Sequence, residues 1–189
     1  MRTTRLAFIA APGLTVVYGL VRLLDGLDGA HGPGFLWTAG HLAFLAALIL
    51  FVNVLLTARR MAGGGAVATT AAVAGVIGAI CSIVQIDIDI VVGITAGDTA
   101  AMKQMFADVQ DIPGVAFAIY GPGPALFYVG LLALAIHLAV VRVAAVWTPV
   151  LLFLGIGVAV ASLDLLPLAG LLILASLAPL AARRTPARA

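Results

Sequence analysis

Long runs of hydrophobic residues, separated by short polar segments, make up most of the chain. Six of these runs approach the roughly 20 apolar residues that a membrane-spanning helix needs. They cover residues 6–24, 35–57, 66–94, 115–141, 145–163 and 165–182. No connection between them is long enough for a second domain. We therefore predict an all-α, polytopic bundle of six transmembrane helices that forms one domain over residues 1–189.

One connection, residues 97–113, is long enough to hold structure of its own. It carries four charged residues, namely Asp98, Lys103, Asp108 and Asp111. Residues 99–109 within it predict a short helix that lies at the membrane surface.

The stretch QIDIDIV, residues 85–91, alternates polar and apolar positions as a β-strand does. An isolated strand in lipid would leave its backbone groups unpaired, at roughly several kcal/mol each. The stretch is therefore predicted to belong to the third helix. Two alternatives remain for Asp87 and Asp89: a functional acid pair inside the bundle, or side chains in the headgroup region if the bilayer boundary falls near Ile86.

Small and polar residues form one stripe along that third helix. They recur every three or four positions, at Gly75, Gly78, Ser82, Gln85, Asp89 and Gly93. The glycines allow a neighbouring helix to approach closely, and Gln85 and Asp89 are expected to face the bundle interior. Asp87 points about 200° away around the helix. It shares that interior only if the helix unwinds locally.

Composition agrees with a membrane protein. The chain is 63% hydrophobic and 10% charged, with a mean hydropathy of +1.22, whereas a soluble domain is about 25% charged. The single cysteine, Cys81, can form no disulfide within the chain. The basic N-terminus before an apolar run resembles a signal peptide, but the run is long and no small-x-small cleavage site closes it. We therefore expect it to be a retained span.

The basic residues predict the orientation. In a six-span arrangement one side receives Arg2, Arg5, Arg59, Arg60, Arg142, Arg183, Arg184 and Arg188. The other side receives Arg22, Lys103 and all of the aspartates, and the chain has no glutamate. The positive-inside rule makes the first side cytoplasmic, with both termini inside. This distribution favours a multi-pass plasma-membrane protein and argues against nucleic-acid binding.

The first helix carries a second polar stripe, at Thr15, Tyr18, Arg22 and Asp25. Arg22 lies on the side that the positive-inside rule depletes of arginine, so we expect it to have a partner. The candidates are Asp25, Asp89 and a bound anion. The alternative is that its side chain extends to the lipid headgroups.

A histidine lies inside the second span. His41 is in line with Trp37, and an intramembrane histidine usually faces the protein interior. Near Asp89 its imidazole would be a proton carrier or a metal ligand. The alternative is a structural hydrogen bond to a nearby carbonyl. His137 lies toward the cytoplasmic end of its span and is predicted to be a packing residue.

Two further segments are expected at the outer mouth. The sequence YGPGP at residues 120–124 should break the fourth helix, because prolines remove backbone donors, and Tyr120 supplies a hydroxyl there. Asp164 lies in the tight turn between the last two spans, where it is expected to cap the sixth helix.

These observations predict one polar cavity open to the outer side. The candidate catalytic residues are Asp89, His41 and Asp87. The candidate substrate-binding residues are Arg22, Tyr18, Asp25, Gln85, Tyr120, Trp37 and Asp164. The sequence has no phosphate-binding loop, HExxH motif or paired cysteines, so it points to no metal site and identifies no cofactor.

The favoured function is a membrane-embedded enzyme that acts on a lipid or isoprenoid-like substrate by acid-base chemistry. Asp89 would be the general acid or base, His41 its proton partner and Arg22 an orienting group. The alternatives are a proton-coupled small-molecule transporter and a non-catalytic accessory subunit. Polar residues become scarce toward the cytoplasm, which favours a cavity with one mouth. The expected partners are membrane lipids and a lipophilic small molecule, and a homo-oligomer is left open.

Overall fold

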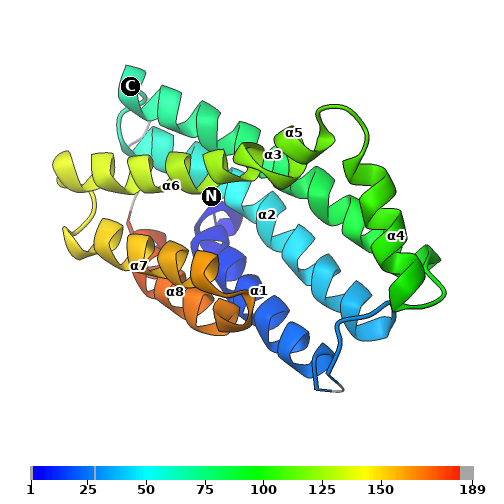
Figure 1. The fold of residues 1–189 in the computed structure, drawn as a ribbon. Helices are drawn as coiled ribbons and strands as arrows, with labels where there is room; N and C mark the ends of the chain where they lie inside the picture. Colours follow the sequence, from blue (N-terminus) through cyan, green and yellow to red (C-terminus); the bar gives the residue numbers. More distant parts are fainter. Residues whose placement is uncertain (1, 28, 184–189) are drawn as a thin grey trace.

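The computed structural model describes residues 2–27 and 29–183, and every regular element in them is helical (Figure 1). The helices are α1 (Arg2–Asp25), α2 (Phe35–Met61), α3 (Ala66–Thr95), α4 (Thr99–Gln110), α5 (Val115–Tyr120), α6 (Pro122–Val140), α7 (Trp147–Ala161), the 3-10 helix η1 (Leu163–Leu165) and α8 (Leu166–Ala181). The all-α prediction is confirmed for this part of the chain. Arg184, Arg188 and Asp28 lie outside the described residues.

Five helical segments are long and apolar enough to cross a membrane. They are Arg5–Asp25, Phe35–Met61, Ala66–Thr95, Val115–Val140 and Leu163–Ala181. The remaining predicted span corresponds to α7, which is apolar but has only 15 residues. QIDIDIV lies within α3, as the cost of unpaired backbone groups in lipid requires.

Neighbouring helices pack side by side in the bundle (Figure 1). α1 packs against α2 and α8, α3 packs against α2 and α6, and α7 packs against α8. The short helix predicted within residues 97–113 is present as α4, and the Asp98 carboxylate caps it by accepting a hydrogen bond from the Ala101 backbone N–H at 2.8 Å. α4 lies at one end of the bundle, where it contacts α3 and α5.

Glycines bring α3 and α6 into backbone contact. A Cβ atom at Gly78 would collide with the backbone of Phe127, and one at Gly130 would collide with the backbone of Gly75. Phe127 is thereby held against Phe51, with ring centroids 5.2 Å apart. The close approach expected from the small-residue stripe is present.

The predicted break in the fourth span is also present. α5 ends at Tyr120, Gly121 has non-helical dihedral angles (φ −119°, ψ −124°), and α6 begins at Pro122. Gly123 is required by the geometry, because a Cβ atom there would collide with the carbonyl oxygen of Ala118.

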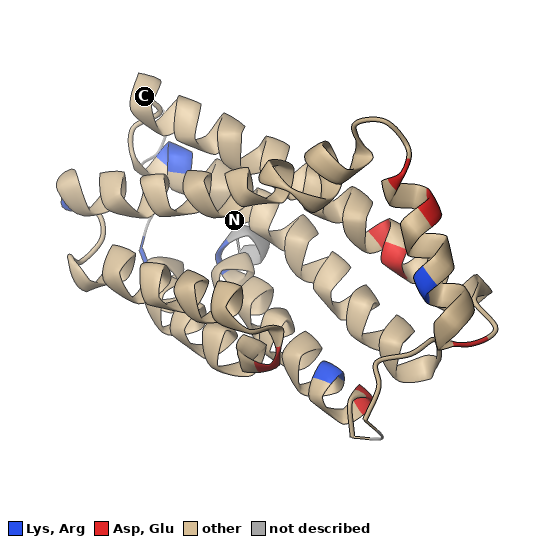
Figure 2. Cartoon of the chain, viewed as in Figure 1, with Lys and Arg blue, Asp and Glu red and all other residues tan. Residues whose placement is uncertain are grey.

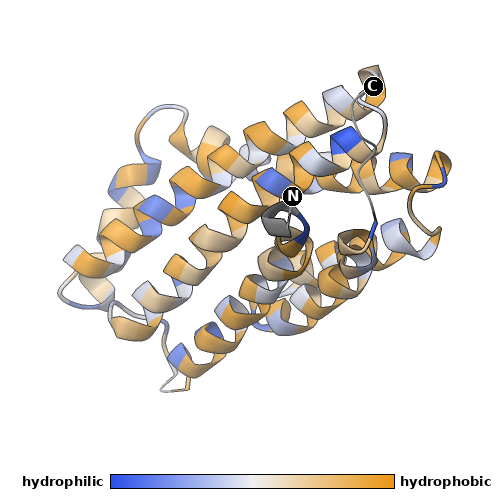
Figure 3. Cartoon of the chain, turned by 180° about the vertical axis from the view of Figure 1, so that it is seen from behind, coloured by the Kyte–Doolittle hydropathy of each residue, from blue (hydrophilic) through white to orange (hydrophobic). Residues whose placement is uncertain are grey.

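Charged residues gather at the two ends of the bundle, whereas apolar residues cover the helices between them. In Figure 2, blue basic positions gather mainly at the end where α6 is joined to α7, and most red acidic positions lie at the end that carries α4. Figure 3 shows that apolar positions dominate the helices. Many of these apolar side chains are exposed on the bundle, among them Leu20, Ile49, Ile80, Val129 and Leu171. Long apolar helices with apolar outer faces indicate an integral membrane protein.

Gly78→Ala is expected to destabilise the fold by about 1–3 kcal/mol, because its methyl group overpacks the contact between α3 and α6. Gly157→Ala is the matched control, since a Cβ atom there has nothing within 4 Å and alanine favours a helix. Thermal unfolding in detergent should show a lower midpoint for the first variant and an equal or higher midpoint for the second. Equal unfolding midpoints for the two variants would show that the contact between α3 and α6 does not stabilise the fold.

Candidate functional site

A cavity of about 390 Å³ lies in the half of the bundle that carries most of the aspartates. Its walls come from α1, α2, α3, α6, α7, η1 and α8. The residues that line it are Tyr18, Arg22, Trp37, His41, Phe44, Leu48, Ser82, Gln85, Ile86, Asp89, Pro124, Tyr128, Ala159, Val160, Leu163 and Leu166. Its volume is near the lower limit of the roughly 300–1,000 Å³ typical of small-molecule sites.

Asp89 and His41 face each other in this cavity. The whole residues are 9% and 4% exposed, and Asp89 Oδ2 lies 3.7 Å from His41 Nε2. The Tyr18 hydroxyl lies 3.5 Å from the same nitrogen. Three proton-exchanging groups from α1, α2 and α3 therefore meet at His41 Nε2.

The other ring nitrogen fixes the imidazole tautomer. His41 Nδ1 lies 2.7 Å from the Trp37 carbonyl oxygen. A carbonyl oxygen only accepts, so Nδ1 carries a hydrogen and donates it. In the neutral ring Nε2 is consequently an acceptor, directed toward Tyr18 and Asp89. The structural hydrogen bond, one of the alternatives at the level of sequence, is thus present at Nδ1, and it leaves Nε2 free to face Asp89.

The distance between Asp89 and His41 suits exchange of a proton. At 3.7 Å the two atoms are beyond direct hydrogen-bond distance, so a proton transfer between them requires a bridging water or a small side-chain movement. One proton on either group lets the two interact favourably: the acid donates to neutral His41, or protonated His41 donates to the carboxylate.

Trp37 positions both members of this pair. Its indole N–H donates to the Asp89 backbone carbonyl at 2.8 Å, and its ring stacks on His41 with centroids 4.2 Å apart. Gly93 makes room for the indole, because a Cβ atom there would collide with the ring. From the sequence, Trp37 was predicted only to bind substrate, and its contact with α3 is seen only in the structure.

Four of the candidate residues do not line the principal cavity, namely Asp25, Asp87, Tyr120 and Asp164. Asp25 lines a smaller neighbouring pocket, where its Oδ2 lies 3.3 Å from Nδ1 of His31. Asp87 is exposed and does not line the cavity. Its inclusion among the catalytic candidates therefore has no support from the geometry, because α3 stays helical and turns its side chain away from Asp89.

Tyr120 and Gln85 have different positions relative to the site. The Tyr120 hydroxyl oxygen is buried and has no hydrogen-bond partner among the described residues, and this residue does not line the principal cavity. Gln85 does line the cavity, one turn of α3 before Asp89.

Asp164 corrects two expectations. It does not cap α8, which has no side-chain cap. The Ser162 hydroxyl oxygen instead accepts from the Asp164 backbone N–H at 3.2 Å. The Asp164 carboxylate pairs with Arg22, with Oδ1 3.5 Å from Nε. Among the described residues, Arg22 thus forms its ion pair with Asp164 rather than with Asp25 or Asp89, because the turn after α7 packs beside α1.

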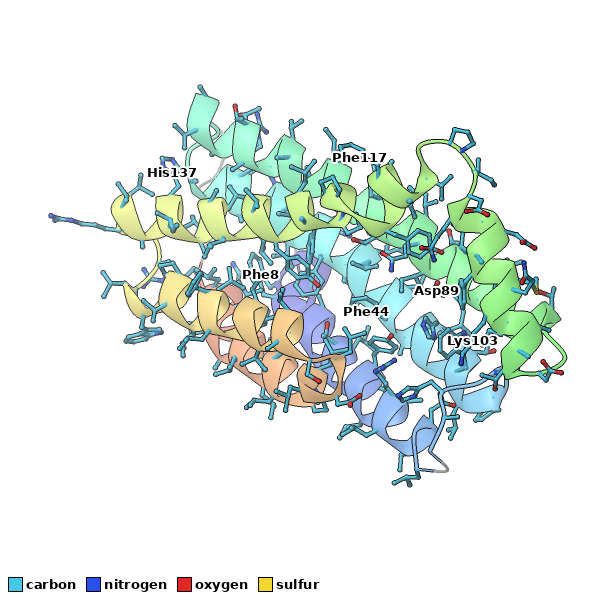
Figure 4. All side chains as sticks on the ribbon, viewed as in Figure 1. Phe8, Phe44, Asp89, Lys103, Phe117 and His137 are labelled. Carbon is cyan, nitrogen blue, oxygen red and sulfur yellow. The ribbon has the colours of Figure 1, made fainter. Side chains whose placement is uncertain are left out.

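Sequence reasoning did not find the apolar wall of the cavity. That wall includes Phe44, Leu48, Ala159, Val160, Leu163 and Leu166. Such residues are common in every span, so no spacing along the chain distinguishes them. His137 lies near the opposite end of the bundle from Asp89, as Figure 4 shows. Within the described residues, no group of three or more His, Cys, Asp or Glu side chains could hold a metal ion.

The chain matches no protein-family model, and no curated protein or solved structure shows significant similarity to it. Its chemistry must therefore be inferred from the geometry of the cavity.

Gly93→Ala is expected to displace the indole of Trp37, because the added methyl group occupies the position of the ring. In a Trp147→Phe background Trp37 is the remaining tryptophan. Its fluorescence emission should then shift to longer wavelength as the ring becomes more hydrated. Gly97→Ala is the control, since a Cβ atom at Gly97 meets nothing within 4 Å. An unchanged emission spectrum for Gly93→Ala would contradict the positioning role of Trp37.

Proposed function

We propose that this protein is a membrane-embedded enzyme that performs acid-base chemistry on a lipophilic, lipid or isoprenoid-like substrate. The observation that carries the proposal is the pairing of Asp89 with His41, 3.7 Å apart, in the wall of a largely apolar cavity. A buried carboxyl group and an imidazole at that separation can exchange a proton with each other and with a bound molecule. Asp89 is the general acid or base, and His41 is its proton partner.

The border of the cavity supports entry from the bilayer. Val160 and Leu163 line the cavity and are 75% and 52% exposed on the outer face of the bundle. Pro124 and Tyr128 of α6 line the cavity too. An apolar molecule dissolved in the lipid can therefore reach Asp89 between α6 and α7 without crossing water.

The opposite half of the bundle favours an enzyme over a transporter. Its interior holds buried apolar side chains such as Phe8, Val54 and Leu134. The buried polar groups there are already bonded, as Ser176 is to the Thr148 carbonyl at 2.8 Å. A transporter needs a path to both faces, whereas an enzyme needs one mouth.

We propose six spans, with α7 as the fifth and both termini in the cytoplasm. α7 is about 22 Å long at 1.5 Å per residue, against a hydrocarbon thickness of about 30 Å, so local thinning of the bilayer would accommodate it. The distribution of charge supports six spans. If α7 crosses the membrane, Arg142 and Arg183 fall on the same side as Arg59 and Arg60.

Asp89→Asn is expected to reduce turnover by at least about 100-fold, because the amide keeps the size of the side chain but cannot exchange a proton. His41→Gln should have a similar effect. Asp87→Asn should be as active as wild type, since Asp87 is exposed two residues away on the same helix. The measurement is mass spectrometry of liposomes made from the total lipid extract of the host, before and after incubation with each purified protein.

Thermal unfolding of the same preparations separates loss of chemistry from loss of fold. A lipid species consumed by wild type and by Asp87→Asn, but not by a folded Asp89→Asn, is the expected result. Equal consumption by Asp89→Asn would overturn the assignment. If no lipid is consumed, and a pH-sensitive dye inside the liposomes instead reports a proton flux that depends on Asp89, the protein is a transporter.

The orientation predicts the labelling of single cysteines in a Cys81→Ala background. Gly65→Cys lies in the connection after α2, and Ala100→Cys is exposed on α4. In intact cells an impermeant maleimide should label Ala100→Cys, and Gly65→Cys should react only after the membrane is opened. The reverse pattern would invert the topology, and labelling of both would contradict the number of spans between them.

A further inference from the structure

We infer that the cavity binds a single-chain amphiphile whose anionic headgroup, a phosphate or carboxylate, is held by Arg22. This inference names a substrate class and so rests on the proposed function. It starts from Arg22, which among the described residues is the only lysine or arginine that lines the cavity.

The guanidinium group of Arg22 has unused binding capacity. Its side chain is only 18% exposed, and its Nε atom is buried without a hydrogen-bond partner among the described residues. A guanidinium group carries five N–H donors in a planar fork that matches the oxygens of a phosphate or carboxylate. A buried donor without an acceptor is unfavourable, so a ligand that supplies oxygens there is bound preferentially.

The resident counter-ion is exchangeable. Asp164 Oδ1 lies 3.5 Å from Arg22 Nε, but its geometry makes no hydrogen bond and its side chain is 61% exposed. The Asp164 carboxylate is mostly in contact with water, so its attraction to Arg22 is largely screened and contributes little to stability. An anionic headgroup with aligned oxygens can therefore displace this carboxylate, which returns to water at the mouth of the cavity.

The position of Arg22 sets where the rest of the ligand lies. Arg22 is one turn of α1, about 6 Å, nearer the Asp25 end of the helix than Tyr18, whose hydroxyl lies 3.5 Å from His41. A headgroup at Arg22 therefore places the first carbons of the chain at the level of the Asp89 and His41 pair. Those carbons, or the bond that joins them to the headgroup, are where proton transfer would act.

The apolar part of the cavity has room for one acyl chain, which extends from there toward the lipid. Besides the polar cluster, the cavity is lined by apolar side chains, among them Phe44, Val160, Leu163 and Leu166. A volume of about 390 Å³ is small for a molecule with two acyl chains, since pockets for drug-sized ligands already measure roughly 300–1,000 Å³. The chain extends past the exposed Val160 into the surrounding lipid.

Thermal unfolding of the purified full-length protein in a non-ionic detergent tests the inference. The probes are dodecyl phosphate, 1-dodecanol, dodecyltrimethylammonium and inorganic phosphate, each titrated below its micelle concentration. Dodecyl phosphate should bind at least about tenfold more tightly than 1-dodecanol. Inorganic phosphate alone should not change the unfolding temperature, because it lacks the chain that the apolar wall contacts. Equal binding of the phosphate and the alcohol would overturn the inference, as would an equal response to inorganic phosphate.

Matched variants locate the headgroup. Arg22→Gln should remove the preference for dodecyl phosphate, and Arg22→Lys, which keeps the charge but lacks the fork, should retain part of it. Lys103→Gln, the same change of charge at an exposed site on α4, should bind as wild type does. Asp164→Asn should tighten binding several-fold because it removes the competing carboxylate, whereas Asp108→Asn should not.

The outcomes separate this inference from the proposed function. If Arg22→Gln and Lys103→Gln lose the same amount of affinity for dodecyl phosphate, the ligand is attracted by overall charge, and the headgroup site is wrong. If headgroup selectivity is absent while the Asp89-dependent lipid conversion persists, the enzyme stands and this substrate class is wrong. If Arg22-dependent binding is present without conversion, the substrate class stands and the enzyme is wrong.

Discussion

The fold depends on the close contacts that glycines permit along one face of α3. Lipid is as apolar as the side chains of these helices, so apolar burial alone does not drive them together, and dispersion contacts between close backbones must do so. Gly78 lets α3 touch the backbone of α6, and Gly93 admits the indole of Trp37 from α2. Asp89 lies on that same face, so the contacts that hold the bundle together also fix the position of the acid.

The polar groups of the cavity are tolerated because each charged group has a counter-ion or can become neutral by gaining or losing a proton. Ionised groups inside a membrane are costly and need compensation. Asp89 and His41 can share one proton, and Trp37 holds them in place through the Asp89 carbonyl and the face of the imidazole. Arg22 lies at the mouth, where Asp164 supplies an exposed counter-ion. This arrangement, with the Asp89 and His41 pair inside and Arg22 near the rim, is what the proposed substrate with an apolar chain and a polar head would require.

Much of the fold followed from local pattern, and part of the site did as well. Alternation in QIDIDIV could not outweigh the requirement that backbone groups be paired in lipid, so residues 85–91 are helical. The three- and four-residue spacing put Asp89 and Gln85 on one face and Asp87 on another, as observed. Helical periodicity reports which side chains share a face, and in an apolar solvent the polar face turns inward.

The sequence by itself thus determined the helices, the break at Gly121 and the inward direction of Asp89, because each depends on neighbours within a few residues. Only the tertiary structure decided which groups meet. His41 reaches Asp89 and Tyr18 across three helices, and Asp164 pairs with Arg22 although it is 142 positions later in the chain. The apolar wall was likewise decided by packing, because leucine and valine occur in every span and their spacing carries no information about which neighbour they face.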